Sequence, residues 1–140
     1  MSPRHTHRTN RVTLARVPRG LSRKWHRARA VGRLAAKRAL KLAALRDCGR
    51  RCVYCAKLLV PELATLDHVY PLAHGGAHTL GNLVAACGRC NRMKGELLPV
   101  EFFMRYPWAG HNFMIYARAV HRALKRCARR AVSLAYAEAA

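Results

Sequence analysis

Apolar residues recur at helical spacing near the start of the chain. From about residue 22 to 46 the sequence is rich in alanine, contains no proline and has Gly32 as its one glycine. The larger apolar residues of this stretch are spaced as on one side of a helix: Val31, Leu34, Leu42 and Leu45. Because a serine side chain can accept a hydrogen bond from the first turn of a helix, we expect Ser22 to cap its start.

The same spacing predicts a longer helix near the end of the chain, from about His111 to Ala137. Apolar residues three or four positions apart are expected to form its buried stripe: Phe113, Ala117, Val120, Leu124, Ala128, Ala131 and Leu134. A short helix over residues 99–107 precedes it and is expected to pack on the core.

Between these helices the pattern changes to short apolar runs separated by turn residues. Residues 63–70 and 82–86 predict two strands, and the segment between them predicts an irregular loop with Gly75 and Gly76 at its centre. A short helix over residues 89–96 follows the second strand. The predicted order is therefore strand, loop, strand, helix.

These elements predict an α+β protein in four parts. We expect a disordered basic arm over residues 1–21, a basic alanine-rich helix over 22–47, a small domain over 48–107 and a basic amphipathic helix over 108–140. A domain of roughly 60 residues buries little apolar surface, so a bound metal would stabilise it.

The charge of the chain is strongly positive. Lysine and arginine number 27 against 6 acidic residues, which gives a net charge of +21 and a pI near 11.3. Such a chain attracts polyanions, because each neutralised phosphate releases condensed counterions. We therefore expect nucleic acid as the partner. A membrane protein fits less well, since no apolar run approaches the ~20 residues that span a bilayer, and nothing indicates a small-molecule substrate.

The N-terminal residues carry charge with no apolar run after them, so they do not resemble a secretory signal. An arginine-rich start without acidic residues could also belong to an organellar transit peptide. We expect a cytoplasmic, non-secreted protein. In a reducing compartment, paired cysteine spacings favour metal binding over disulfides.

Four of the six cysteines form two Cys-x-x-Cys pairs, Cys52 with Cys55 and Cys87 with Cys90. Each pair places two thiolates on one tight turn, and two such turns complete the tetrahedral shell that zinc prefers. A redox pair would be a single Cys-x-x-Cys near a βαβ pattern, which is not found here. With four protein ligands the zinc would be structural.

An Asp-His dipeptide lies between the two cysteine pairs. Successive strand side chains point to opposite faces, so Asp67 and His68 would diverge and could do different work. His68 could act as a general base, and Asp67 could hold a hard divalent cation such as Mg²⁺ or Mn²⁺. Asn91, directly after the second cysteine pair, offers a neutral oxygen to the same ion.

Taken together, these residues resemble the HNH endonuclease family in its zinc-bearing form. The resemblance rests on the order of the two cysteine pairs, the Leu66-Asp67-His68-Val69 run, the two glycines, Asn82-Leu83, Asn91 and Lys94-Gly95. It covers about a third of the chain and implies a ββα-metal (His-Me finger) core. The final position of the motif, histidine in the family's name, is Asn91 here.

The resemblance also implies roles for individual residues. His68 would activate water, Asp67 and Asn91 would bind the catalytic metal, and Asn82 would brace the loop and help to orient His68. The implied reaction is hydrolysis of DNA, expected to be duplex, leaving 5′-phosphate and 3′-hydroxyl ends.

Two other functions remain open. The chain could be a non-catalytic zinc module that binds nucleic acid, or an enzyme directed at RNA. Three basic residues flank Asn91 and could contact phosphates beside the scissile bond: Arg89, Arg92 and Lys94.

Overall fold

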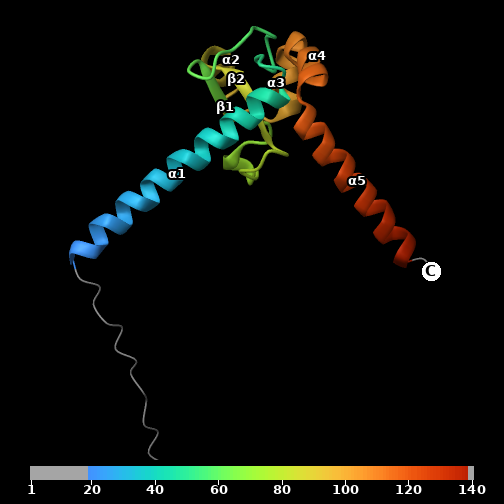
Figure 1. Ribbon diagram of the computed structural model, residues 1–140. Coiled ribbons are helices and arrows are strands. Elements are labelled where there is room, and N and C mark those ends of the chain that lie inside the picture. Colours follow the sequence, from blue (N-terminus) through green and yellow to red (C-terminus); the bar gives the residue numbers. More distant parts are fainter. Residues whose placement is uncertain (1–18, 139–140) are drawn as a thin grey trace, which may run out of the picture. The chain divides into compact units, whose positions relative to one another are not determined.

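The computed structural model describes residues 19–138 (Figure 1). The first helix, α1, covers Arg19–Asp47. The chain divides into two compact units between residues 34 and 35, a position that falls within the residues of α1. Most of the expected basic arm, residues 1–18, lies outside the described residues. Because α1 already begins at Arg19, Ser22 lies inside the helix, and the prediction that it caps the helix start is wrong.

The second unit is built on a two-stranded antiparallel sheet and a short helix. Strand β1 covers Ala64–His68 and pairs with β2, Leu83–Cys87, so that Asp67 lies opposite Val84 and His68 opposite Leu83. Helix α2, Gly88–Lys94, follows β2 directly. In Figure 1 these three elements form a compact group joined by loops. The expected α+β fold, with its order of strand, loop, strand and helix, is confirmed.

A one-turn 3₁₀ helix, η1, interrupts the loop between the strands at Leu72–His74. Gly75 ends it with a φ of 84°, a conformation that glycine adopts without steric cost. A Cβ on Gly76 would lie 1.9 Å from the backbone oxygen of Tyr70. Only glycine therefore allows the loop to fold back so closely on the end of β1.

The core of the second unit is small and mixes aliphatic and aromatic side chains. The last turns of α1 contribute Ala44 and Leu45, which are 0% and 3% exposed. Tyr54 and Phe102 are fully buried and meet edge to face, with ring centroids 5.0 Å apart. The other three apolar residues of the predicted apolar side of α1 remain exposed: Val31, Leu34 and Leu42.

The C-terminal part of the chain forms three helices: α3 (Pro99–Arg105), α4 (Pro107–Tyr116) and α5 (Arg118–Glu138). The sequence predicts one helix where α4 and α5 are found. The helix breaks at Ala117, whose ψ is 57°. Ala117 and Ala119 are both buried, yet positions two apart lie on opposite sides of a continuous helix. The break at Ala117 allows both to reach the core.

The predicted buried stripe of the last helix is only partly correct. Phe113, Ala117 and Val120 are buried, but Leu124 is 61% exposed and Leu134 is 56% exposed. Ala128 and Ala131 are exposed as well. Within residues 35–138, α5 continues past the last element that packs against it, so its second half has no described partner.

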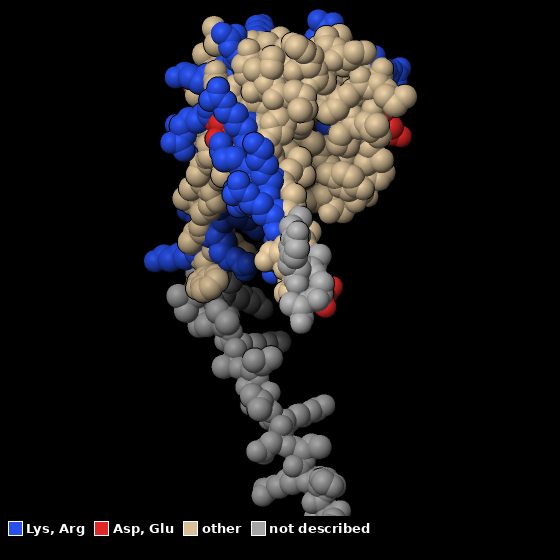
Figure 2. All heavy atoms as spheres, turned by 90° about the vertical axis from the view of Figure 1, so that its right-hand side faces the viewer, with Lys and Arg blue, Asp and Glu red and all other residues tan. Residues whose placement is uncertain are grey.

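Basic side chains cover much of α5. The exposed lysines and arginines of this helix are Arg118, Arg122, Lys125, Arg126, Arg129 and Arg130, and Figure 2 shows basic side chains gathered along it. Arg122 donates a hydrogen bond of 2.7 Å to Asp47 at the end of α1. Among the described helices, none combines the length and the apolar character needed to cross a membrane.

Candidate metal centre and active site

The two cysteine pairs converge on one point. Cys52 and Cys55 lie in the turn after α1, Cys87 ends β2, and Cys90 lies in the first turn of α2. The four sulfur atoms lie within 4.8 Å of one another. The Sγ atoms of Cys55 and Cys87 are 3.9 Å apart, close to the ~3.8 Å expected between thiolates on a tetrahedral zinc ion. The four cysteines are thus positioned to bind a metal.

Hydrogen bonds from the backbone shape both cysteine turns. Cys52 N–H donates to Lys57 O, and Ala56 N–H donates to Cys52 O. The backbone N–H of Cys90 points at Cys87 Sγ over 3.4 Å, a bond that favours the charged thiolate. Backbone donors therefore contribute to the shape of both turns.

The protonation of these thiols depends on a bound cation. Burial raises the pKa of Cys52 to about 11 and also raises the pKa of Cys90. At neutral pH these two side chains are therefore protonated when no cation is present. Metal ligation requires thiolates, so binding of a metal ion would release protons.

Asp67 lies on the buried side of β1 and is 5% exposed. The hydroxyl of Tyr54 donates a hydrogen bond to Asp67 Oδ2, and Lys94 Nζ lies 3.5 Å from the same oxygen. Burial raises the pKa of Asp67, while the nearby Lys94 charge and the Tyr54 hydroxyl work in the opposite direction. The carboxylate is thus held in place by two buried donors.

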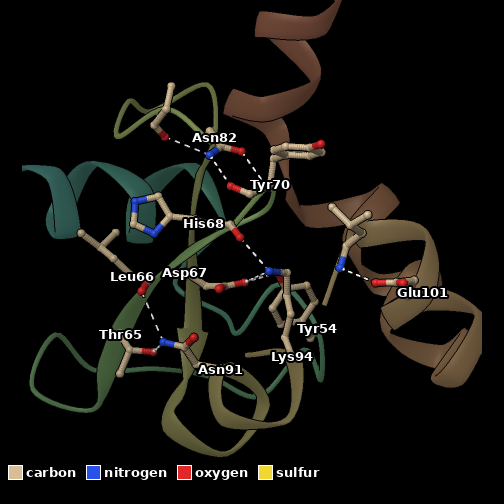
Figure 3. A network of polar contacts seen from close by, with 12 residues as sticks. Tyr54, Thr65, Leu66, Asp67, His68, Tyr70, Asn82, Asn91, Lys94 and Glu101 are labelled. Atoms are coloured by element: carbon tan, nitrogen blue, oxygen red, sulfur yellow. Dashed lines mark hydrogen bonds and ion pairs between the residues drawn. The ribbon is translucent and has the colours of Figure 1, made fainter. Parts of the chain in front are cut away.

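Lys94 connects α2 to β1. It is 1% exposed, and its ammonium group donates a hydrogen bond of 2.7 Å to the backbone oxygen of His68. Figure 3 shows Lys94 reaching across to both Asp67 and His68. The expectation that Lys94 contacts a phosphate is therefore wrong, because its charged group faces the interior and is already occupied there.

His68 ends β1, and its ring leaves the strand on the side opposite to the Asp67 carboxylate (Figure 3). Its Nε2 atom lies 2.9 Å from Nδ1 of His78, a residue of the loop between the strands. Burial lowers the pKa of His68, and the neighbouring His78 and Lys94 lower it further. His68 is therefore neutral at pH 7, as a general base must be.

Asn82 fastens the loop that follows His68. Its Oδ1 accepts a 2.8 Å bond from Tyr70 N–H, and its Nδ2 donates bonds of 2.9 Å to Tyr70 O and Ala77 O. The side chain thus joins the beginning of the loop to its later part. Within the described residues, no hydrogen bond joins the side chain of Asn82 to that of His68.

Asn91 faces β1 from the middle of α2. Its Nδ2 donates to Thr65 Oγ1 over 3.0 Å and to Leu66 O over 3.3 Å. These bonds orient the amide, so that its Oδ1 is the atom available to a ligand. Asn91 lines a cavity of about 200 Å³ together with Asp67 and His68.

Part of the chain matches a known protein family. The sequence profile described as HNH endonuclease matches residues 52–97, the segment that contains both cysteine pairs, β1, β2 and α2. The expected resemblance of this part of the chain to the HNH endonuclease family is confirmed. We call this part of the chain the HNH segment.

Two curated proteins resemble part of the chain. The CRISPR-associated endonuclease Cas9 of Actinomyces naeslundii is 41% identical over 58 residues, which are 41% of this chain and 5% of that protein. The Cas9 of Corynebacterium diphtheriae is 41% identical over 47 residues, 33% of this chain and 4% of that protein. The chain thus spans about one twentieth of the length of the relatives it matches.

Among solved structures, the chain resembles the crystal structure of the Type II-C Cas9 enzyme from Actinomyces naeslundii. The TM-score is 0.46 at 27% sequence identity, and the match covers 61% of this chain and 12% of that chain.

The HNH segment contains two side chains at the site that sequence reasoning did not identify, Tyr54 and His78. Tyr54 is only one of the two residues between the first cysteines, and nothing in the spacing distinguishes it from Val53. His78 lies in an irregular loop, where no periodicity predicts a contact. Of the predicted basic contacts, Arg89 and Arg92 are exposed on α2.

Proposed function

We propose that the chain is a metal-dependent endonuclease that hydrolyses DNA phosphodiester bonds at its HNH segment. The observation that carries this proposal is the shared cavity, because Asp67, His68 and Asn91 come from β1 and α2 and line the same space. A general base and two oxygen donors in one cavity are what metal-assisted phosphodiester hydrolysis needs.

His68 supplies the base. Its imidazole is neutral at pH 7 because burial and two nearby basic groups lower its pKa. It can therefore accept a proton from a water molecule that attacks phosphorus. The backbone oxygen of His68 is bound by Lys94, which fixes the end of β1 from which the ring projects.

Asp67 and Asn91 are the residues proposed to hold the catalytic ion. A carboxylate and an amide oxygen form a hard donor set that suits Mg²⁺ or Mn²⁺, and two protein ligands leave positions for water and phosphate oxygens. When bound, the ion would stabilise negative charge on the scissile phosphate and the leaving oxygen. Tyr54 and the Asn91 bonds to β1 hold the two side chains before any ion arrives.

The cysteine cluster is proposed to hold structural zinc. The sulfur spacing fits a tetrahedral ion, and four cysteines leave no open position for water. The cluster joins the turn after α1 to the end of β2 and the start of α2. It would therefore fix the elements from which Asp67, His68 and Asn91 project.

DNA is proposed as the substrate. The net charge of +21 favours a polyanion, and the similar proteins are named endonucleases. Exposed arginines on α2, Arg89 and Arg92, and the basic side chains of α5 offer phosphate contacts.

A non-catalytic nucleic-acid-binding module is the second candidate, because the charge alone would support it. An RNA-directed nuclease is a third, since the cavity residues do not distinguish the two sugars. Single-stranded RNA, single-stranded DNA and duplex DNA offered in parallel separate these functions.

The test is cleavage of supercoiled plasmid by the zinc-loaded protein with Mg²⁺ or Mn²⁺. We expect nicking by the wild-type protein and its loss in His68→Ala, with equal zinc content in both. Equal nicking by the two proteins would rule out His68 as the base. Salt-sensitive binding without cleavage in any metal would favour the non-catalytic module.

A further inference from the structure

His78 is the nearest polar partner of the proposed base. The Nδ1 atom of His78 lies 2.9 Å from Nε2 of His68, and the ring centroids are 5.1 Å apart with the planes inclined by 41°. We propose that His78 is a positioning residue, which holds the His68 ring so that its Nδ1 is the atom that accepts the proton from water. This inference rests on the proposed nuclease function.

The hydrogen bond couples the protonation of the two rings. Two neutral imidazoles can share an N–H···N bond only if one donates and the other accepts. A neutral imidazole has a single N–H. If His68 Nε2 donates to His78 Nδ1, then His68 Nδ1 is left unprotonated and can act as a base. The opposite arrangement would place the proton of His68 on Nδ1 and remove its basicity there.

The loop supports this arrangement by fixing both neighbours of His78. The Asn82 side chain donates to Ala77 O over 2.9 Å, and the Asn82 backbone N–H donates to Thr79 O over 2.8 Å. His78 lies between these two anchored residues. Asn82 can therefore act on His68 without touching it, because it fixes the loop position from which His78 reaches the His68 ring.

The surroundings of the other ring nitrogen of His68, Nδ1, are consistent with a role in catalysis. Within residues 19–138, the only side-chain hydrogen bond made by the His68 ring is the one to His78. His68 is one of the residues that line the cavity shared with Asp67 and Asn91. A histidine of this cavity whose ring is held at Nε2 is arranged as an oriented base.

The variants His78→Asn and His78→Leu test the inference in the full-length protein. The amide group of asparagine places a hydrogen-bonding atom where Nδ1 of histidine lies, whereas leucine places a methyl group there. His74→Leu is the matched control, because His74 is an exposed histidine of the same loop with no contact to His68.

The first readout is independent of activity. Nitrogen-15 spectra of the histidine rings, assigned with His68→Ala, report which nitrogen carries the proton. We expect one Nε2–H form of His68 in the wild type, in His78→Asn and in His74→Leu, and a mixture of both forms in His78→Leu. An unchanged His68 spectrum in His78→Leu would overturn the inference, whether or not the protein cleaves DNA.

The second readout is single-turnover cleavage. We expect His78→Leu to lower the maximal single-turnover rate constant about three- to tenfold, with little change in the protein concentration that gives half of that rate, as for loss of one hydrogen bond. His78→Asn should recover most of that loss, and His74→Leu should match the wild type. If wild-type cleavage requires His68 but His78→Leu cleaves at the wild-type rate, the nuclease function stands and the role of His78 does not.

Discussion

The hydroxyl of Tyr54 donates a hydrogen bond to the carboxylate of Asp67. Tyr54 lies between Cys52 and Cys55, so one side chain connects the cysteine cluster to the proposed catalytic carboxylate. Its ring is packed against Phe102 and Phe113, and its backbone oxygen accepts a bond from Asn112. The turn that carries the first cysteine pair therefore makes a direct contact with the proposed active site.

Tyr54→Phe isolates this contact, since it removes the hydroxyl and keeps the ring. We expect Asp67 to lose one of its two buried donors and the protein to lose about 1–2 kcal/mol of unfolding free energy. The concentration of Mg²⁺ needed for half-maximal cleavage should change, while zinc content should not. Tyr106→Phe, in the same aromatic cluster, is the control, and an equal effect of both variants would contradict this role.

Removal of the metal from the cysteine cluster should unfold the HNH segment. Its small core depends on the turns that the four cysteines close, and burial holds Cys52 and Cys90 protonated without a cation. We expect a strong chelator to abolish cooperative thermal unfolding, measured by circular dichroism, and added zinc to restore it.

Cysteine substitutions separate the cluster from the remaining thiols. Cys87→Ser should lower the zinc content below one ion per chain, whereas Cys127→Ser, at an exposed position on α5, should leave it unchanged. A Cys87→Ser protein with full zinc content and unchanged stability would contradict the assignment of the cluster.

The buried ammonium of Lys94 is expected to stabilise the fold strongly. Lys94→Met leaves Asp67 without its cationic neighbour in a buried site, which typically costs about 3–5 kcal/mol. Because the Lys94 charge lowers the pKa of Asp67, that pKa should rise further in the variant. Urea unfolding measures the loss of stability. Arg92→Met, at an exposed position of the same helix, should change stability little, and similar losses in both would contradict the buried pair.

The pH dependence of cleavage should reflect the lowered pKa of His68. The base must be neutral, and burial lowers its pKa from the ordinary value of 6.5. Activity should therefore persist below pH 6.5 and fall only at more acidic pH, as His68 becomes protonated. Asp67, whose pKa is raised by burial, also becomes protonated as the pH falls.

Metal concentration distinguishes the two groups in a pH–rate profile. An acid limb set by Asp67 should shift when the Mg²⁺ concentration is raised, because metal and proton compete for the carboxylate. An acid limb set by His68 should not shift when the Mg²⁺ concentration is raised. A single limb centred above pH 6.5 would contradict the structure around His68.

The sequence predicted those parts of the site that depend on local spacing. Each Cys-x-x-Cys pair closes a short turn, and the alternation of a strand separates Asp67 from His68, so these features follow from neighbours in the chain. The strand, loop, strand, helix order was predictable for the same reason.

Tertiary contacts account for what the sequence did not predict. Lys94 looks like a surface lysine on a seven-residue helix, and only the approach of α2 to β1 buries it. The break at Ala117 has no glycine or proline to mark it. His78 contacts His68 because the hydrogen bonds of Asn82 fix the loop that contains His78. Leu124 stays exposed because α5 extends beyond the elements that pack against it.

Single-turnover cleavage of a labelled DNA duplex by wild type and His68→Ala, both fully zinc-loaded and in Mg²⁺, tests the central claim most directly. Loss of a general base should lower the rate by about 10²–10⁴-fold, and the wild-type products should carry 5′-phosphate and 3′-hydroxyl ends. Equal rates for the two proteins would show that His68 is not the base of a nuclease site.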